Sequence, residues 1–186
     1  QTNYPEQGSV ELTVNPRKSR EFAVAVRIPA WSKITMVTVN GQAVADVRPG
    51  SYLTVSRTWK EGDKIALNFD MRGRLTELNG YQAIERGPVV LARDTRLGEG
   101  FVDETCVVQT SGGYVELMPV TDKPAGVWMA FSAPMKLGTD TEGRAAGIVQ
   151  VPLCDFASAG NTWHPAVRYR VWLRRTFDPI SDPWVE

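Results

Sequence analysis

Short segments that alternate apolar and polar residues recur along this chain, and residues that favour turns separate them. Residues 9–14 (SVELTV) and residues 22–28 (FAVAVRI) both place apolar side chains at every second position. This period matches an extended strand that buries one face and exposes the other. Asn15-Pro16 follows the first segment and predicts a turn, so we expect the two strands to form a hairpin.

The clearest local signal is the pair Asn40-Gly41, which separates residues 34–39 from residues 42–47. Asn-Gly readily adopts the two positive φ angles that a two-residue hairpin turn requires. Gly87-Pro88 lies inside residues 81–92, and we expect a break or bend there because proline is confined to strand starts, edges and bulges. Further strands are expected at residues 52–55, 64–69, 105–109, 114–118, 127–131, 147–153 and 166–173.

Strands at intervals of about 8–12 residues predict an antiparallel β-sandwich or barrel. No segment repeats apolar residues at helical spacing over three turns, so the expected fold class is all-β. The chain has 186 residues, enough for one large or two small β-domains. The polar stretch at residues 93–100 is the predicted junction, and we expect two consecutive β-sandwich halves, residues 1–96 and residues 97–186.

Charge and composition exclude several classes of partner. The 21 basic and 21 acidic residues cancel, so no net field attracts nucleic acid or an anionic membrane surface. No apolar run approaches the roughly 18 residues that a membrane span needs. Hydrophobic residues make up 42% of the chain, which is enough to bury a core. We therefore expect a folded protein without nucleic-acid or membrane partners, and we favour a periplasmic or extracellular location over a cytoplasmic one.

Residues for catalysis or metal binding are scarce. His164 is the one histidine, which excludes any site with two imidazoles. Cys106 and Cys154 lack metal-ligand spacing, and we favour two separate buried thiols over a single disulfide bridge. The chain has no glycine-rich phosphate loop, and no pair among its 21 acidic residues stands out as an acid/base pair. We predict no catalytic residue, no bound metal and no cofactor.

Tryptophans are the candidates for ligand contacts. Trp31, Trp59 and Trp163 lie near turn residues, where an aromatic ring can contact a carbohydrate or a neighbouring domain. Trp128 and Trp172 lie within alternating runs, so we expect both in the core.

Three residues are candidates for structural roles. Asn40 and Gly41 form the expected hairpin turn, and Arg86 precedes the expected bend at Gly87-Pro88. The planar guanidinium of Arg86 can donate hydrogen bonds to carbonyl groups or a carboxylate where the chain bends.

Four short motifs together resemble a known family. They are residues 27–31 (RIPAW), 39–41 (VNG), 59–63 (WKEGD) and 85–90 (ERGPVV). Their order and spacing are similar to the region that follows the catalytic barrel in glycoside hydrolase family 127 (GH127), which includes β-L-arabinofuranosidases. The resemblance covers residues 8–96. It is looser over residues 151–161 and 170–173, where Asp155 and Phe156 stand in place of the tyrosines usual in that family.

The resemblance implies a non-catalytic accessory β-sandwich portion of a glycoside hydrolase. In that family an (α/α)₆ barrel on the N-terminal side carries the catalytic glutamate and a zinc-bound cysteine cluster, and none of these residues maps onto this chain. The implied partners are this barrel in the same polypeptide, a second copy of the chain and carbohydrate. Two alternatives stay open: an independent carbohydrate-binding module, which needs exposed aromatic residues, and a cell-surface adhesion or assembly domain, which needs unpaired edge strands.

Overall fold

The computed structural model describes residues 1–98, 101–138, 147–162 and 164–175. The chain divides into two compact units, Gln1–Met71 and Arg72–Glu186. Every strand pair is antiparallel, and within the described residues the strands are accompanied by one 3₁₀ turn at Thr95–Leu97. The expected all-β antiparallel architecture is confirmed. In the part of the chain that the structure describes, no helix has the length and apolar character of a membrane span.

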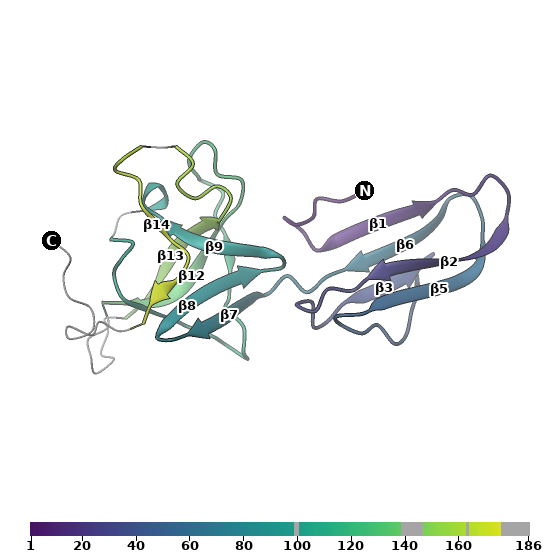
Figure 1. Ribbon diagram of the computed structural model, residues 1–186, viewed down its shortest axis with the longest axis horizontal. Coiled ribbons are helices and arrows are strands. Elements are labelled where there is room, and N and C mark those ends of the chain that lie inside the picture. The colour runs from purple at the N-terminus through teal and green to yellow at the C-terminus, as the bar shows by residue number, and fades with distance from the viewer. Residues whose placement is uncertain (99–100, 139–146, 163, 176–186) are drawn as a thin grey trace. The chain divides into compact units, whose positions relative to one another are not determined.

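The first unit is a two-layered sandwich of six strands, of which β1, β2, β3, β5 and β6 are labelled in Figure 1. One sheet has the order β1-β6-β3-β4, and the second contains β2 and β5. The strands are β1 Ser9–Val14, β2 Arg20–Arg27, β3 Met36–Val39, β4 Gln42–Ala43, β5 Tyr52–Trp59 and β6 Asp63–Asn68.

The core of this unit lies between its two sheets. Ile65 from β6 and Trp59 from β5 are both fully buried and belong to one apolar cluster with Val26 and Val37. The indole Nε1–H of Trp59 donates a 2.9 Å hydrogen bond to the carbonyl of Phe22. This bond satisfies the one polar group of a large side chain that otherwise contributes only apolar burial.

The predicted hairpin at Asn40-Gly41 is confirmed. The φ angles are 50° at Asn40 and 80° at Gly41, and Val39 pairs with Gln42 across the turn. The expected hairpin between the first two strands is wrong, because β1 pairs with β6 and β2 pairs with β5. Residues 15–19 carry the chain from one sheet of the sandwich to the other, so the turn signal at Asn15-Pro16 marks a crossover between layers.

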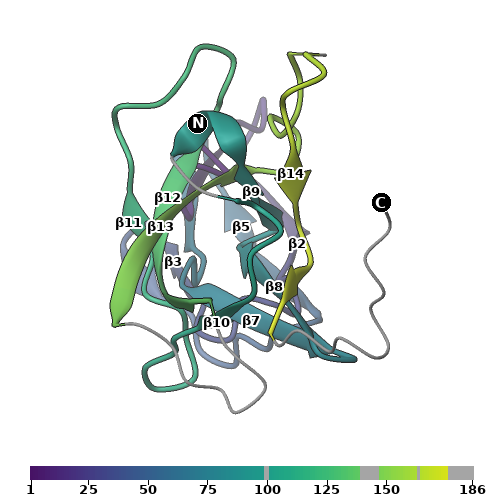
Figure 2. The ribbon, with the colours of Figure 1, turned by 90° about the vertical axis from the view of Figure 1, so that its left-hand side faces the viewer.

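The second unit is a single sheet that curls round on itself, as Figure 2 shows. The main strand order is β10-β12-β13-β9-β8-β15, and β7, β11 and β14 pair with β8, β12 and β9. The strands are β7 Gly73–Leu78, β8 Tyr81–Arg86, β9 Val89–Asp94, β10 Cys106–Val108, β11 Met118–Pro119, β12 Ala130–Leu137, β13 Ile148–Asp155, β14 Tyr169–Arg170 and β15 Leu173–Arg174.

The two ends of this sheet approach each other. The backbone N–H of Val108 in β10 donates a 3.1 Å hydrogen bond to the side-chain carbonyl of the buried Gln82 in β8. Gly73 in β7 forms a further bridge with Val115, and a Cβ atom at Gly73 would lie 2.5 Å from the Val115 carbonyl oxygen. The enclosed interior is apolar and contains residues from nearly every strand, among them Ile84, Leu91, Cys106, Val108, Phe131, Met135, Leu153 and Leu173.

The observed division of the chain differs from the expected boundary after residue 96. Strands β8 and β9 pair with β13, β14 and β15, so residues 73–94 belong to the second unit. The expected break at Gly87-Pro88 is confirmed: the chain reverses there, and Arg86 at the end of β8 pairs with Val89 at the start of β9. Gly87 has a φ of 57°, which glycine adopts without strain.

Candidate functional site

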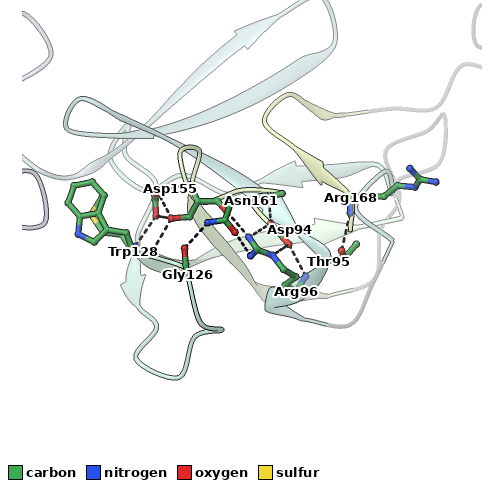
Figure 3. Close-up of polar contacts among 11 residues, drawn as sticks. Asp94, Thr95, Arg96, Gly126, Trp128, Asp155, Asn161 and Arg168 are labelled. Carbon is green, nitrogen blue, oxygen red and sulfur yellow. Dashed lines mark hydrogen bonds and ion pairs between the residues drawn. The ribbon is translucent and has the colours of Figure 1, made fainter. Parts of the chain in front are cut away.

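A buried polar network holds the turn that follows β13 (Figure 3). Asp155 ends β13 and is only 1% exposed. Its carboxylate accepts hydrogen bonds from the Met129 N–H at 2.8 Å, the Ser158 N–H at 2.9 Å and the Ser158 hydroxyl at 2.8 Å. The Ser158 hydroxyl oxygen in turn accepts a bond from the Trp128 N–H at 2.9 Å. The turn is therefore tied to the segment that leads into β12.

A second buried carboxylate extends this network. Asp94 caps the 3₁₀ turn and accepts bonds from the backbone N–H groups of Arg96 and Gly160 at 2.9 and 2.8 Å. The Arg96 guanidinium lies 2.7 Å from Asp94 and also donates to the Ser158 carbonyl at 2.6 Å and to Asn161 at 2.7 Å. Burial raises the pKa of Asp94, but the hydrogen bonds from Arg96 and Gly160 outweigh it and leave this pKa below its ordinary value.

The hydrogen bonds of this network stabilise the local structure. Each carboxylate accepts several hydrogen bonds, so its lone pairs are occupied by the fold. The nearby Cys154 thiol has its pKa raised to about 12 by burial and by the charges of Asp94 and Asp155, and burial raises the pKa of Cys106 to about 11. Both thiols are therefore protonated and poorly nucleophilic at neutral pH. Among the described residues, no group of three or more His, Cys, Asp or Glu side chains could hold a metal ion.

Of the three tryptophans predicted as ligand contacts, Trp31 and Trp59 lie among the described residues. Trp59 is fully buried in the first core, so the expectation that it contacts a ligand is wrong: its position at the end of β5 is an inward one. Trp31 is half-buried, and its ring packs edge-on against Phe69 with 5.7 Å between ring centroids. Trp163 lies outside the described residues. A ligand contact by Trp31 stays a prediction.

Two of the three residues with expected structural roles, Asn40 and Arg86, contact other strands. The Asn40 side chain donates to Asp63 at 2.9 Å and accepts from the Lys64 N–H at 2.8 Å, so it joins the β3–β4 turn to β6. The half-buried Arg86 guanidinium lies over the Phe131 ring at 4.5 Å. Desolvation by burial lowers the pKa of Arg86.

Two tryptophans expected in the core are exposed instead. Trp128 is 46% exposed and Trp172 is 42% exposed. Successive side chains of an extended segment point in opposite directions, and Leu173 points into the core at 3% exposure. Trp172 therefore faces outward, where it borders a pocket together with Tyr81. The alternation in Val171-Trp172-Leu173 predicts an outward-facing Trp172, but only if Leu173 is taken as the inward residue.

Comparisons with known proteins agree with the fold and with its division. Residues 1–71 match the family model described as β-L-arabinofuranosidase, GH127 middle domain. This range coincides with the first compact unit, Gln1–Met71. A search of curated protein sequences gave no match.

Solved structures extend the similarity to nearly all of the chain. A glycoside hydrolase is 26% identical, with a TM-score of 0.77 over 95% of this chain and 32% of its own. A GH127 β-arabinofuranosidase is 22% identical, with a TM-score of 0.69 over 94% of this chain and 31% of its own. A GH127 β-L-arabinofuranosidase from Geobacillus stearothermophilus T6 is 24% identical, with a TM-score of 0.70 over 94% and 30%.

This chain thus spans about a third of the length of the solved chains that it matches. The first unit matches the model of the GH127 middle domain, and the chain as a whole is similar in fold to part of a solved glycoside hydrolase and of two solved GH127 arabinofuranosidases.

Proposed function

We propose that this chain is a non-catalytic accessory part of a glycoside hydrolase resembling the β-L-arabinofuranosidases, and that it supports an (α/α)₆ catalytic barrel of the same polypeptide. The observation that carries the proposal is the unequal coverage: 95% of this chain matches 32% of a solved glycoside hydrolase chain. The match of the first unit to a family model that is named as a middle domain supports the same proposal.

The chemistry of the described residues supports a non-catalytic role. The buried carboxylates Asp94 and Asp155 are engaged by backbone and side-chain donors, and neither thiol is activated. We therefore expect the purified 186-residue chain to release no product above buffer from aryl arabinofuranosides or other aryl glycosides. Release that accompanies the protein through purification and vanishes when one acidic residue is substituted would contradict this proposal.

Exposed aromatic side chains give the second unit a surface that suits contact with another domain. Phe156 and Tyr169 are 51% and 39% exposed, and their rings lie 6.1 Å apart between centroids. An aromatic pair on the surface gains free energy when a partner covers it. We propose that this pair contacts the barrel.

The support role is tested with the reading frame that precedes residue 1. It is expected to encode a barrel with a catalytic glutamate and a cysteine cluster. The barrel produced alone should melt at a lower temperature than the barrel mixed with the 186-residue chain. The Phe156→Ser chain should stabilise the barrel less than wild type, whereas Tyr52→Ser, an exposed aromatic on the first unit, serves as the matched control. A reading frame without a barrel, or equal melting temperatures with and without the chain, would refute the support role.

The same proposal includes a homodimer, and it gives Arg86, Asn40 and Gly41 architectural roles. Sedimentation of the 186-residue chain tests the dimer, which a purely monomeric species over a range of concentrations would exclude.

Arg86→Lys is expected to lower the melting temperature, because a point charge does not reproduce the planar stacking of the guanidinium on Phe131. An unchanged melting temperature would show that this stacking contributes no stability.

A further inference from the structure

A small pocket opens on the second unit beside the last two strands. Its volume is about 290 Å³, and it is lined by Tyr81, Val102, Asp103, Arg170, Trp172 and Arg174. Pockets that hold drug-sized ligands begin at about 300 Å³. The space therefore suits a ligand of about one ring, and it is too small for a nucleotide or an oligosaccharide.

The strand pairing places one wall of this pocket. Tyr81 begins β8, and Arg174 lies directly opposite it in β15. The Arg174 guanidinium donates a 2.9 Å hydrogen bond to the Tyr81 hydroxyl and lies 5.4 Å from the centre of its ring. These contacts hold the Tyr81 ring and a set of N–H donors in fixed positions.

The opposite wall combines a carboxylate with a second guanidinium. Arg170 and Asp103 form an ion pair, and their side chains are 49% and 28% exposed. A pair this open to solvent is weakly held, so a ligand can share its donors and acceptors at little cost. Trp172 lies between Arg170 and Arg174 in the chain and is 42% exposed, which leaves part of its ring available for stacking.

The chemistry of this lining selects one class of ligand. Each hydroxyl group needs both a donor and an acceptor as neighbours, and Asp103 accepts while Arg170 and Arg174 donate. The C–H face of a sugar ring packs on an aromatic face, which Trp172 and Tyr81 supply. The charged walls disfavour an apolar ligand, because its binding would desolvate them without compensation. The Asp103 carboxylate in the same wall would lie against an anion, which disfavours a phosphate.

We propose that this pocket binds a single neutral sugar ring, stacked on Trp172 and hydrogen-bonded by Asp103, Arg170 and Arg174. The proposal does not depend on support of a catalytic barrel, because all the lining residues belong to the second unit.

The test is a nuclear magnetic resonance titration of the ¹⁵N-labelled 186-residue chain with L-arabinose, D-xylose and D-galactose, and in separate arms with D-galacturonate and inorganic phosphate. A single ring is expected to bind with a dissociation constant of about 1 mM or weaker, because few contacts contribute. The indole N–H resonance of Trp172, assigned with Trp172→Phe, should shift on addition of at least one neutral sugar.

Three variants define the site. Trp172→Ala and Asp103→Asn are each expected to weaken sugar binding by about tenfold or more, which corresponds to about 1.4 kcal/mol. Trp128→Ala is the matched control, because Trp128 has similar exposure but does not line the pocket, and its binding should equal that of wild type. If Trp172→Ala fails to fold, the Asp103→Asn variant and the resonance shifts of the wild-type protein still show whether the sugar binds in this pocket. No shift of the Trp172 resonance with any neutral sugar, equal binding by the folded Trp172→Ala or Asp103→Asn variant, or binding confined to galacturonate and phosphate would overturn the proposal.

Discussion

The two cysteines show how burial controls side-chain chemistry in this chain. Cys106 lies in the main apolar cluster of the second unit, whereas Cys154 lies in a smaller cluster with Val127 and Ala130. Both are fully buried and neither forms a disulfide bond, which confirms the prediction of two separate buried thiols. With pKa values of about 11 and about 12, fewer than about one thiol in a hundred is ionised at pH 8.

A thiol-reactive dye should therefore label neither cysteine of the native protein at pH 8. After unfolding in guanidinium chloride the pKa values return to ordinary ones and both thiols should react, giving two equivalents of released dye per chain. Rapid labelling of one thiol in the native state would contradict the burial described above, and fewer than two equivalents after unfolding without reductant would indicate a disulfide.

The glycine of the β3–β4 turn gives a prediction about the backbone. Gly41 has a φ of 80°, and no heavy atom lies within 4 Å of a Cβ built there, so a substitution meets backbone strain and no steric clash. Gly41→Ala should destabilise the protein by about 1 kcal/mol and Gly41→Val by about 1–3 kcal/mol. Urea unfolding measures both. Gln42→Ala, exposed and next in the chain, should stay within about 0.5 kcal/mol of wild type. Equal stability of all three variants would show that the turn carries no strain.

Among the elements, the turn after β13 depends most on its polar contacts. Asp155→Ala removes the acceptor of the Met129 and Ser158 N–H groups and leaves both buried donors without it. The free energy of unfolding should fall by about 3 kcal/mol, since hydrogen bonds to a buried carboxylate are stronger than those between neutral groups. Chemical denaturation of the second unit measures it, with the exposed Asp122→Ala as control. A loss equal to that of the control would show that the network is dispensable.

The β5–β6 turn gives a dependence on pH. The Asp63 carboxylate accepts hydrogen bonds from the Lys60 N–H and from Asn40, both at 2.9 Å, and these bonds lower its pKa below the ordinary value of 3.8. A lowered pKa means that the stabilisation is fully present above pH 3.8 and is lost as the pH falls through the folded-state value. Titration of the Asp63 carboxyl by nuclear magnetic resonance should give a pKa below 3.8, and Asn40→Ala should raise it. A pKa that Asn40→Ala leaves unchanged would exclude Asn40 as a contributor.

Element signals in the sequence were reliable where they were local. The strand at residues 9–14 and the turn at Asn40-Gly41 were predicted correctly, because alternation and Asn-Gly depend only on neighbouring residues. Strand β7 was missed, although Asn79-Gly80 has φ angles of 49° and 81° and repeats the signal of Asn40-Gly41. The partners of β1 and β2 were mispredicted because the observed partner of β1 lies about 50–60 residues away in the chain and that of β2 about 25–40 residues away. The pocket beside Trp172 could not be predicted, since its walls come from three separate segments of the chain.

At the scale of the whole molecule, each unit has an apolar cluster of its own. The polar residues 93–100 predicted a division near residue 96, but residues 94–98 form the 3₁₀ turn that Asp94 caps, directly after β9. The true division at Met71 and Arg72 has no glycine- or proline-rich composition and becomes visible only when the strand partners are known.

Residues 1–71 should therefore fold when produced alone. The fragment contains all six strands of the sandwich and its whole core. We expect a dispersed spectrum and a single cooperative unfolding transition, with the near-ultraviolet circular dichroism of a buried Trp59. A fragment ending at residue 58, which lacks Trp59 and β6, is the control and should stay unfolded. An unfolded 1–71 fragment would show that the first unit depends on the second.

The pairing of Leu173 with Gln82 has a consequence for synthesis on the ribosome. The sandwich of the first unit is complete once Asn68 has left the exit tunnel. Strand β8 pairs early with β7 and β9, but its residues Tyr81 and Gln82 must wait for β15, which is translated some ninety residues later. Until then this part of the β8 edge and the core position of Leu173 stay open. A nascent or prematurely terminated chain thus carries one finished domain and one unfinished sheet, and the unfinished sheet is the part that a chaperone would need to cover.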